Sequence, residues 1–421
     1  MTTQTPQAPR PAWREAPYRR LLIGQGTSLL GDQVWLVVLA WLATGRVAPG
    51  LAGLVIAAPS IPRALLFLWA GATVDRRAPE RVAVVCDVLL AAVFVIAAGL
   101  AWTAGAAQLT VLLAAVGLTV GIADAFFFPA TAALRPRLLA EEQLAGGTSA
   151  YEIVSRTAMI AGPVLGGVLV GFSAVWLACA ANAATFLVSA VCLAGLRPRS
   201  APHATAPHRR TLGMVREGLA YLWSHHQLRA LVAVLTAFNL AIAGALNMGG
   251  ILVARHRGMG PTGAAALFTG FAAGAIAGAL TLTLRRPKDR DDPMRWIGGA
   301  GLLQAIGIAC IAFSGDAVQL AGASLLSGAS SAIIGVLAST LVQQATDDRF
   351  RGRVNSVTGL VNYGVPPLAL GLTGVLADWR GPTAALLVLA AAEAVAAATC
   401  LRREHRRHVR DRTDPAPRAS H

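Results

Sequence analysis

The chain has 421 residues, of which 55% are hydrophobic and 14% are charged, and its formal net charge is +15 at pH 7. Soluble domains carry about 25% charged residues, so this composition excludes a soluble multidomain protein. The positive charge does not indicate nucleic-acid binding, because the arginines lie in short gaps between apolar runs, a pattern typical of membrane topology.

Twelve apolar runs are long enough to cross a bilayer as helices, since a hydrocarbon core about 30 Å thick needs about 20 helical residues. The first is expected to stay in the mature protein, because residues 1–18 are polar and Pro-rich and contain no signal-peptide core. The predicted spans are 20–44, 50–74, 81–103, 109–132, 147–171, 174–196, 229–253, 261–284, 296–314, 317–341, 355–377 and 382–401.

The spans divide into two halves around a polar joint. The turns after spans 4 and 10 are both charged, and each is followed by a helix with Pro and spaced Gly, which indicates an internal duplication. We therefore predict an all-α membrane protein with two six-helix bundles and pseudo-two-fold symmetry. Its expected parts are an N-terminal tail (1–19), a first bundle (20–196), a linker (197–228), a second bundle (229–401) and a basic tail (402–421).

Arginines gather in alternate gaps between the spans. They precede the first span and follow spans 2, 4, 6, 8, 10 and 12, whereas the gaps 104–108, 172–173 and 315–316 carry no basic residue. Arg255 and Arg257 are the main exception. Because basic residues mark the cytoplasmic side, both termini and the joint are predicted to be cytoplasmic, in a multi-pass protein of the bacterial inner (cytoplasmic) membrane.

The joint contains an apolar stripe at helical spacing, formed by Leu212, Val215, Leu219 and Leu222. This spacing predicts an amphipathic helix that lies on the membrane surface. The simplest interpretation is a linker helix without a function of its own.

Six charged residues lie inside the predicted spans of the first half and away from their first and last residues, and a charge at the bilayer centre costs about 2.5–3.5 kcal/mol on insertion scales. At about 1.5 Å per helical residue, three of them come out near mid-depth and Asp87 lies shallower. Glu152 and Arg156 are four residues apart and can pair along one helix face. The candidates for proton coupling are Asp32, Arg63, Asp87, Asp124, Glu152 and Arg156.

Two interpretations of Asp32 stay open. It either binds a proton or a charged group of a substrate, or it forms a static structural pair with Arg63. An unpaired carboxyl favours the protonated form, whereas a close guanidinium favours the ionised form.

Neutral polar residues complete the candidate cavity. Gln25, Ser28 and Trp35 share a helical face with Asp32. The second half has Glu393 as its one intramembrane charge, so we hypothesise that it offers hydrogen bonds to the substrate while the first bundle carries the charge coupling. Any one of these groups can instead form an interhelical hydrogen bond. The second-half candidates are Asn239, Asn247, Gln304, Asn362 and Tyr363.

Several stretches carry a resemblance to a known family. They are "GQGTSLLGDQV" in span 1, "GATVDRRAPERV" after span 2, "FFFPATAALRPRLLAEEQLA" after span 4, "REGLAYLWSHHQLRAL" in the joint and "RFRGRVNSV" before span 11. Together they resemble the major facilitator superfamily over nearly the whole chain. The resemblance is greatest to its exporter-like branch, which includes the enterobactin exporter and macrolide efflux proteins.

The loop after span 2 resembles the superfamily's loop 2–3 signature, which implies a latch between neighbouring helices in one gate state. The matching residues are Gly71, Asp75, Arg76, Arg77 and Arg81. This copy departs from the pattern, because "APE" replaces the usual Gly-basic run and the second-half counterpart lacks the Asp. Topological anchoring alone explains the arginines but not the acid.

Span 5 contains "AGPVLGG", in which Gly162, Pro163, Gly166 and Gly167 resemble a motif of proton-coupled antiporters. Small residues let two helices approach, and Pro permits a bend. Ordinary glycine packing is the alternative interpretation. The basic residue that drug–proton antiporters carry in span 4 is missing, which puts a standard proton relay in doubt.

The resemblance implies a secondary active transporter that exports a hydrophobic or amphiphilic small molecule, such as an antibiotic, drug or siderophore-like metabolite, by alternating access and proton antiport. The chain has no GxxxxGK[ST] motif, so a proton gradient is the expected energy source and no cofactor is expected.

No span contains a His for a metal or a nucleophilic triad, and we expect neither an enzyme nor a nucleic-acid partner. A monomer in the lipid bilayer is expected. The alternatives are a proton-coupled importer of a small solute and a non-transporting receptor or membrane-embedded enzyme.

Overall fold

The computed structural model describes residues 11–103, 105–171, 175–196, 219–284, 293–346 and 351–413. Helices connected by short turns make up these ranges, and no strand occurs in them. Ten helices in this part of the chain are long and apolar enough to cross a membrane. A helix suits this setting because it satisfies its backbone hydrogen bonds internally. The all-α membrane class is confirmed, while the number twelve stays a prediction.

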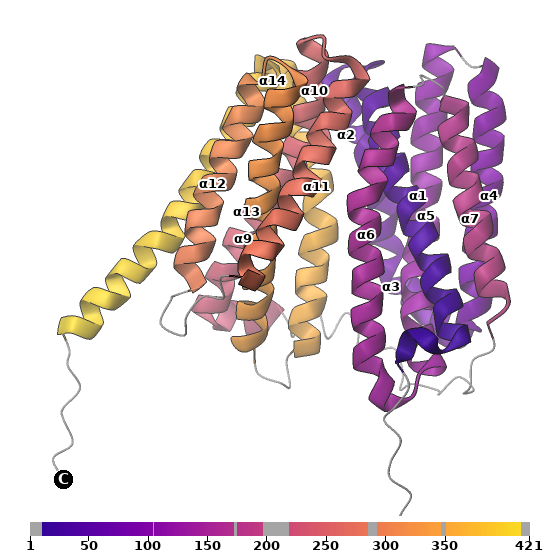
Figure 1. The fold of residues 1–421 in the computed structure, drawn as a ribbon, viewed down its shortest axis with the longest axis horizontal. Helices are drawn as coiled ribbons and strands as arrows, with labels where there is room; N and C mark the ends of the chain where they lie inside the picture. Colours follow the sequence, from indigo (N-terminus) through magenta and orange to yellow (C-terminus); the bar gives the residue numbers. More distant parts are fainter. Residues whose placement is uncertain are drawn as a thin grey trace, which may run out of the picture. The chain divides into compact units, whose positions relative to one another are not determined.

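The chain divides into two compact units, of which unit 1 comprises residues 1–47 and 54–212. Within it, α1 packs against α6 and α7, α4 against α5 and α7, and α3 against α5 (Figure 1). Its helices are α1 (Ala16–Thr44), α3 (Ser60–Arg76), α4 (Pro79–Thr103), α5 (Ala106–Leu138), α6 (Leu144–Gly171) and α7 (Val175–Ala194), with short 3₁₀ turns at Ala12–Arg14 and Glu141–Gln143.

The second predicted span is not one continuous helix. It consists of α2 (Pro49–Ala57) and α3, with a turn at residues 58–59 between them. Pro59 and Pro62 lie at and just after the break, and proline both lacks a backbone donor and clashes with the preceding turn of a helix. The predicted span 50–74 thus consists of two helical segments in succession.

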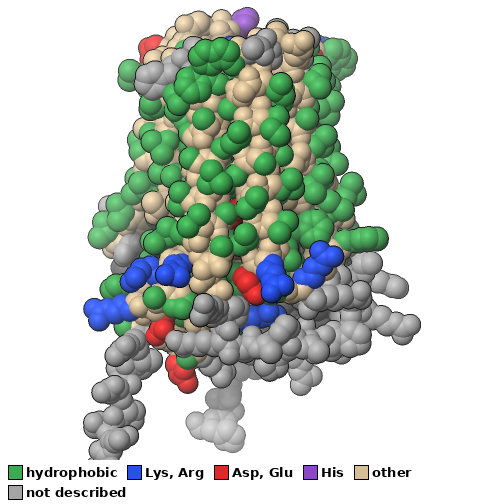
Figure 2. Space-filling view, turned by 90° about the vertical axis from the view of Figure 1, so that its right-hand side faces the viewer, with side chains coloured by type: hydrophobic (Ala, Val, Ile, Leu, Met, Phe, Trp, Pro, Cys, Tyr) green, Lys and Arg blue, Asp and Glu red, His purple; other side chains and the backbone are tan. Residues whose placement is uncertain are grey.

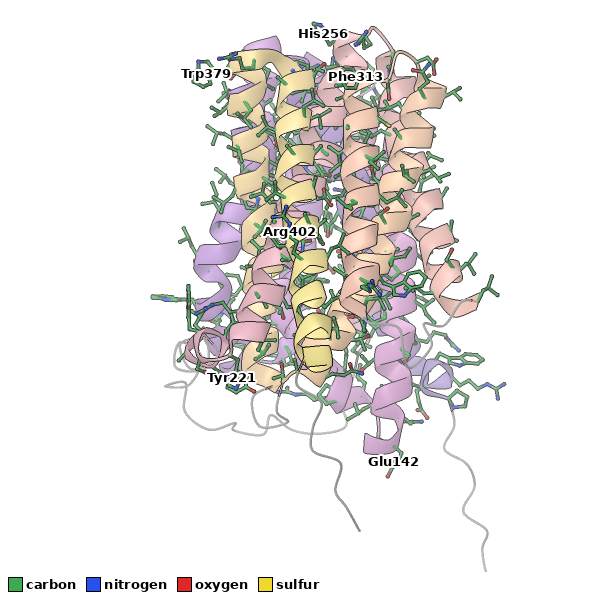
Figure 3. The ribbon with its side chains drawn as sticks, turned by 90° about the vertical axis from the view of Figure 1, so that its left-hand side faces the viewer. Glu142, Tyr221, His256, Phe313, Trp379 and Arg402 are labelled. Atoms are coloured by element: carbon green, nitrogen blue, oxygen red, sulfur yellow. The ribbon has the colours of Figure 1, made fainter. Side chains whose placement is uncertain are left out.

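Unit 2 comprises residues 48–53 and 213–421. The predicted seventh span consists of α9, a π-helical turn and α10 in succession. Gly381, with φ 82° and ψ 163°, interrupts α14 between the predicted spans 355–377 and 382–401. The bounds are α9 (His226–Gly244), the π turn η3 (Ala245–Gly249), α10 (Gly250–His256), α11 (Gly260–Leu284), α12 (Pro293–Phe313), α13 (Ala317–Gln344) and α14 (Arg351–Thr413). His256, Phe313 and Trp379 lie at one end of the unit, and Tyr221 lies at the other (Figure 3).

Glycines bring α11 and α13 into close contact. A Cβ added to Gly270, Gly274 or Gly278 would meet the backbone of α13 at Ala321, Leu325 and Ala329, respectively. Small residues at such positions allow helices to pack closely in lipid, where van der Waals contact drives much of their association.

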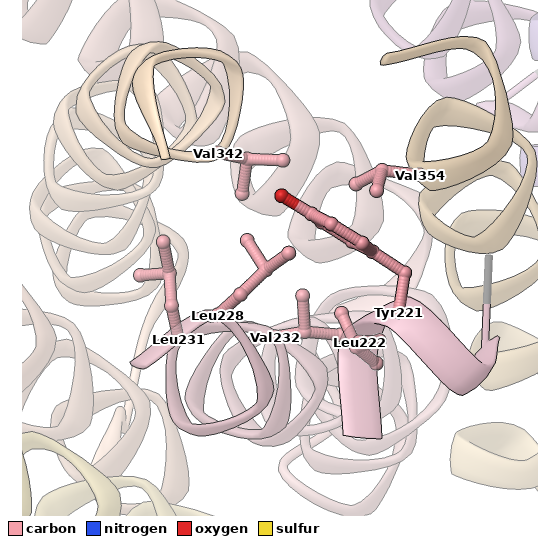
Figure 4. Close-up of a cluster of buried hydrophobic side chains, with 7 residues drawn as sticks. All are labelled: Tyr221, Leu222, Leu228, Leu231, Val232, Val342 and Val354. Carbon is pink, nitrogen blue, oxygen red and sulfur yellow. The ribbon is translucent and has the colours of Figure 1, made fainter. Parts of the chain in front are cut away.

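The described end of the joint packs into unit 2. Residues 197–218, which include Leu212 and Val215, lie outside the described residues, and the helical turn from residue 219 to 224 follows. Its Tyr221 and Leu222 join a buried apolar cluster (Figure 4). The apolar side chains of this end thus pack on unit 2, and its position at the membrane surface stays a prediction. The joint cluster consists of Tyr221, Leu222, Leu228, Leu231, Val232, Val342 and Val354.

The outer face of unit 1 is apolar over most of its height. Large apolar side chains of α4 and α7 are exposed there, among them Val85, Ile96 and Val191. Figure 2 shows this apolar face, with Lys and Arg side chains gathered toward one end. Exposed apolar area on this scale suits a helix surface in contact with lipid.

Candidate functional site

An ion pair between α3 and α5 forms the centre of the candidate site. Nη2 of Arg63 bonds to Oδ2 of Asp124, and their side chains are 22% and 4% exposed. The two helices approach closely because Gly121 faces the backbone of Pro59, where a Cβ would not fit. Asp124 and Arg63 each lie about one helical turn further along their helices, so this glycine contact brings them together. The guanidinium also lies 5.6 Å from the ring centroid of Phe128.

Two further acids lie near this pair. Asp32 of α1 is half-buried, its Oδ1 has no hydrogen-bond partner in the described part of the chain, and Asp124, Arg63 and Asp87 are within its electrostatic range. Asp87 of α4 is fully buried, with Ser189 of α7 and Asp124 as polar neighbours. We call Asp32, Arg63, Asp87 and Asp124 the charge cluster.

The composition of the charge cluster determines its chemistry. It holds three carboxyl groups and one guanidinium, so with every group ionised its net charge would be −2, from three negative charges and one positive charge. Carboxylates close together in a medium of low dielectric constant repel one another, and protonation relieves this repulsion. The arrangement can therefore bind and release protons.

The structure brings together the residues that were predicted at mid-depth. The ion pair it shows for Arg63 is with Asp124, whereas the structural interpretation considered a pair with Asp32. Asp87, predicted to be shallower, lies within electrostatic range of Asp32. Their role in coupling stays a prediction.

Glu152 and Arg156 form the predicted pair along one face of α6, with 3.7 Å between Oε2 and Nε. Their side chains are 55% and 73% exposed, so this pair is not buried in unit 1. A pair with this exposure contributes little to stability, and its part in coupling stays a prediction.

The polar face of α1 is turned into unit 1. Gln25, Ser28 and Trp35 are buried. The Trp35 ring packs edge-on against Phe94 at 4.9 Å between centroids. This contact gives Trp35 a place in an aromatic core, and the proposed cavity role of these three residues stays a prediction.

The glycines of the antiporter-like motif face α1. A Cβ on Gly162 would meet Gln33, and one on Gly166 would meet the backbone of Val34 and the side chain of Val37. Pro163 and Gly167 are buried as well. The motif thus allows the close approach of α6 to α1 that its small residues predicted.

The loop 2–3 signature lies at the end of α3 and the start of α4. Arg77 and Arg81 are exposed, whereas the surroundings of Gly71 and the side chains of Asp75 and Arg76 lie outside the described part of the structure. The latch stays a prediction.

The second-half candidates lie in several settings. Nδ2 of Asn239 donates to the carbonyl of Leu235 at 3.0 Å, and Nδ2 of Asn247 donates to that of Ala243 at 3.1 Å, so both amides bond to their own helix. Gln304 is 1% exposed. The side chains of Asn362 and Tyr363 are outside the described residues.

Sequence reasoning missed the polar residues of α7 that face α1. Asn182 and Ser189 are both buried. A Cβ on Gly31 would meet the Asn182 side chain, and one on Gly24 would meet Ser189. Their spacing of seven residues places them on one helical face, which was the available signal.

Known proteins resemble this chain in sequence and fold. The sequence matches the profile of the Major Facilitator Superfamily over residues 21–365, with a second match over 251–420. The multidrug efflux pump Tap of Mycobacterium tuberculosis is 28% identical over 381 residues, which cover 86% of this chain and 87% of that protein. The pump of the same name from Mycolicibacterium fortuitum is 27% identical over 395 residues, covering 89% and 93%. A solved structure of a bacterial homologue of the iron transporter ferroportin, in an inward-facing state, has a TM-score of 0.72 at 18% identity and covers 92% of this chain and 98% of its own, a likeness that shows the fold alone.

Proposed function

The chain belongs to the Major Facilitator Superfamily, and on this premise we propose that it exports a hydrophobic or amphiphilic small molecule in exchange for protons. The superfamily expected from the sequence is thereby confirmed, and the protein is a multi-pass membrane transporter. The exporter-like branch, the substrate and the coupling ion belong to the proposal.

The direction and substrate class are supported by the relatives. Two proteins that match this chain over most of its length are named multidrug efflux pumps. Efflux pumps with many substrates act on molecules that share apolar surface and differ in detail. An antibiotic, a drug or a siderophore-like metabolite fits this description.

The charge cluster is the observation that carries the proton part of the proposal. Asp32 is the proposed proton carrier, because its Oδ1 has no hydrogen-bond partner among the described residues while a second acid, Asp124, is already bonded to Arg63. A proton on Asp32 changes the net charge of the cluster by one. A conformation that binds the proton better is favoured when the proton is present, and this linkage couples the gradient to transport.

The rest of the proposal follows the sequence predictions. We propose that both termini are cytoplasmic and that the protein lies in the inner membrane. The two bundles expose a central substrate site to one side of the membrane at a time. In this scheme, the Gly162–Gly167 segment permits close packing of α6 on α1, and the loop 2–3 segment latches one gate state.

Asp32→Asn in proteoliposomes tests the coupling. Ethidium, a fluorescent lipophilic cation, serves as the transported probe, and a pH-sensitive dye reports proton movement. We expect the wild type to move ethidium when a pH gradient is applied and to move protons when an ethidium gradient is applied, and we expect Asp32→Asn to lose both. Asp316→Asn is the matched control, because Asp316 is an exposed carboxyl that caps α13.

The outcomes separate the parts of the proposal. Unchanged ethidium-driven proton movement in Asp32→Asn would remove Asp32 from the coupling mechanism. If Arg63→Ala prevented folding and Asp32→Asn restored it, Asp32 would be a structural partner of Arg63 instead. Counterflow measured in inside-out vesicles shows the direction, and net uptake into the cell would establish an importer.

A further inference from the structure

Glu393 is a buried acid that the charge cluster does not include. It lies in α14, within unit 2, and is 0% exposed. Neither of its carboxyl oxygens has a hydrogen-bond partner among the described residues. The ion pairs found among the described residues do not include it either.

A second buried polar group without partners lies at the same level of the fold. In the contact between α12 and α14, Gly298 and Gly301 both face Ala397. The two helices are antiparallel there, so one turn further along α12 and one turn back along α14 lead to Gln304 and Glu393. Gln304 is 1% exposed, and both its amide oxygen and its amide nitrogen have no partner in the described part of the chain. The register thus places a carboxyl and an amide opposite each other.

Among the residues with described side chains, the surroundings of Glu393 offer no compensating charge. Phe238 of α9 packs against Gly301, next to Ala397, and an apolar cluster around Ile297 and Ala300 continues from there. The titratable or charged groups with described side chains on the elements packed against the second part of α14 lie near the ends of those helices. They are Arg229 on α9, Arg255 and His256 on α10, and Arg295 and Cys310 on α12.

A carboxylate in such a place has lost its hydration and gained no counter-charge, which strongly disfavours the ionised form. The neutral acid is different, because its O–H can donate to the amide oxygen of Gln304 while its carbonyl oxygen accepts from the amide nitrogen. This exchange would give a partner to both carboxyl oxygens of Glu393 and to the amide oxygen and nitrogen of Gln304. A glutamine opposite a carboxyl can serve both protonation states, since an amide is both donor and acceptor.

We propose that Glu393 and Gln304 form a second proton-binding site, located in unit 2. Glu393 holds its proton in the conformation described here and releases it in a conformation that lets water into the contact between α12 and α14. Proton affinity and the closure of this contact are then linked, so that each changes the other by the same factor. The participation of this proton in the transport cycle rests on the proposed function.

Infrared spectroscopy of the purified protein tests the site without transport. At neutral pH we expect a carbonyl stretch from a protonated carboxyl that disappears in Glu393→Gln, shifts in Gln304→Leu and persists in Asp316→Asn. Glu393→Gln preserves the shape of the protonated acid, and Gln304→Leu provides a second variant that leaves the acid in place. A wild-type spectrum at neutral pH that does not change on Glu393→Gln would overturn the site.

Proteoliposomes then test its part in transport. We expect Glu393→Gln, loaded with ethidium, to exchange fewer protons per ethidium and to show a flatter dependence of efflux on pH than wild type. If the infrared band is lost but the proton count and the pH profile stay those of wild type, Glu393 is a structural acid and the inference is wrong. If ethidium efflux by the wild type does not depend on the pH gradient while the infrared band of Glu393 is present, the proposed proton antiport is wrong. The proton-binding site itself would then still be supported.

Discussion

Arg63→Leu removes the cation of the charge cluster and leaves three carboxyl groups behind. Removing one partner of a buried ion pair costs about 3–5 kcal/mol of unfolding free energy. Because the Arg63 side chain is 22% exposed, solvent screens part of this cost, and we expect a loss near the lower limit, about 3 kcal/mol. Asp124→Asn should cost less, about 1–2 kcal/mol, because Asp32 remains near Arg63 as an opposite charge.

The two changes belong to one network, so their effects should not add. We expect the double variant to be less destabilised than the sum of the single variants by about 1–3 kcal/mol. The measurement is reversible unfolding in mixed micelles, titrated with a denaturing detergent and followed by circular dichroism. At acidic pH the cost of Arg63→Leu should shrink, because protonation neutralises the carboxylates that it leaves unpaired.

Arg257→Leu is the matched control, since Arg257 is exposed at the end of α10. Additive effects of Arg63→Leu and Asp124→Asn would refute the view that the pair acts as a unit. The same conclusion would follow if Arg63→Leu cost no more than Arg257→Leu.

Two further predictions use the same unfolding measurement. Gly328→Ala in α13 should destabilise the protein, because its Cβ would meet the backbone of Phe271, and overpacking of about 1–3 kcal/mol exceeds the roughly 1 kcal/mol gained in helix propensity. Gly335→Ala in the same helix has open space and should be neutral or stabilising, so equal effects of the two would contradict the packing. Tyr221→Ala should lose about 3–5 kcal/mol, the usual cost of deleting a buried aromatic side chain, whereas Tyr221→Phe keeps the ring in the joint cluster; similar losses in both variants would show that the ring does not anchor the joint.

Counting residues along each helix was sufficient to bring Asp32, Arg63 and Asp124 to one depth, because each could be measured from a charged residue at its own cytoplasmic end. The partner of Arg63 could not be identified in this way. It depends on how α1 and α5 are rotated about their axes, and a membrane helix is apolar on both its lipid-facing and its protein-facing sides. Residue counts also ignore helix tilt, so the shallower depth of Asp87 stays a prediction.

Helix irregularities were predicted unevenly. Gly381 followed by Pro382 coincides with the gap predicted between 377 and 382, since glycine ends helices and proline begins them. The π turn at Ala245–Gly249 left no signal, because an uninterrupted apolar run reads as one span whatever its hydrogen bonding. The opposition of Gln304 and Glu393 could not be predicted from the sequence either, because it follows from the register of α12 on α14.

The turn at Gly381 has a consequence for biosynthesis. A single non-helical residue separates the two apolar stretches of α14, with Asp378, Trp379 and Arg380 immediately before it. During synthesis the two helices should therefore enter the membrane as one hairpin. The linker between them is too short for the second helix to be inserted long after the first. An epitope inserted at this point would have to lengthen a connection that now spans one residue.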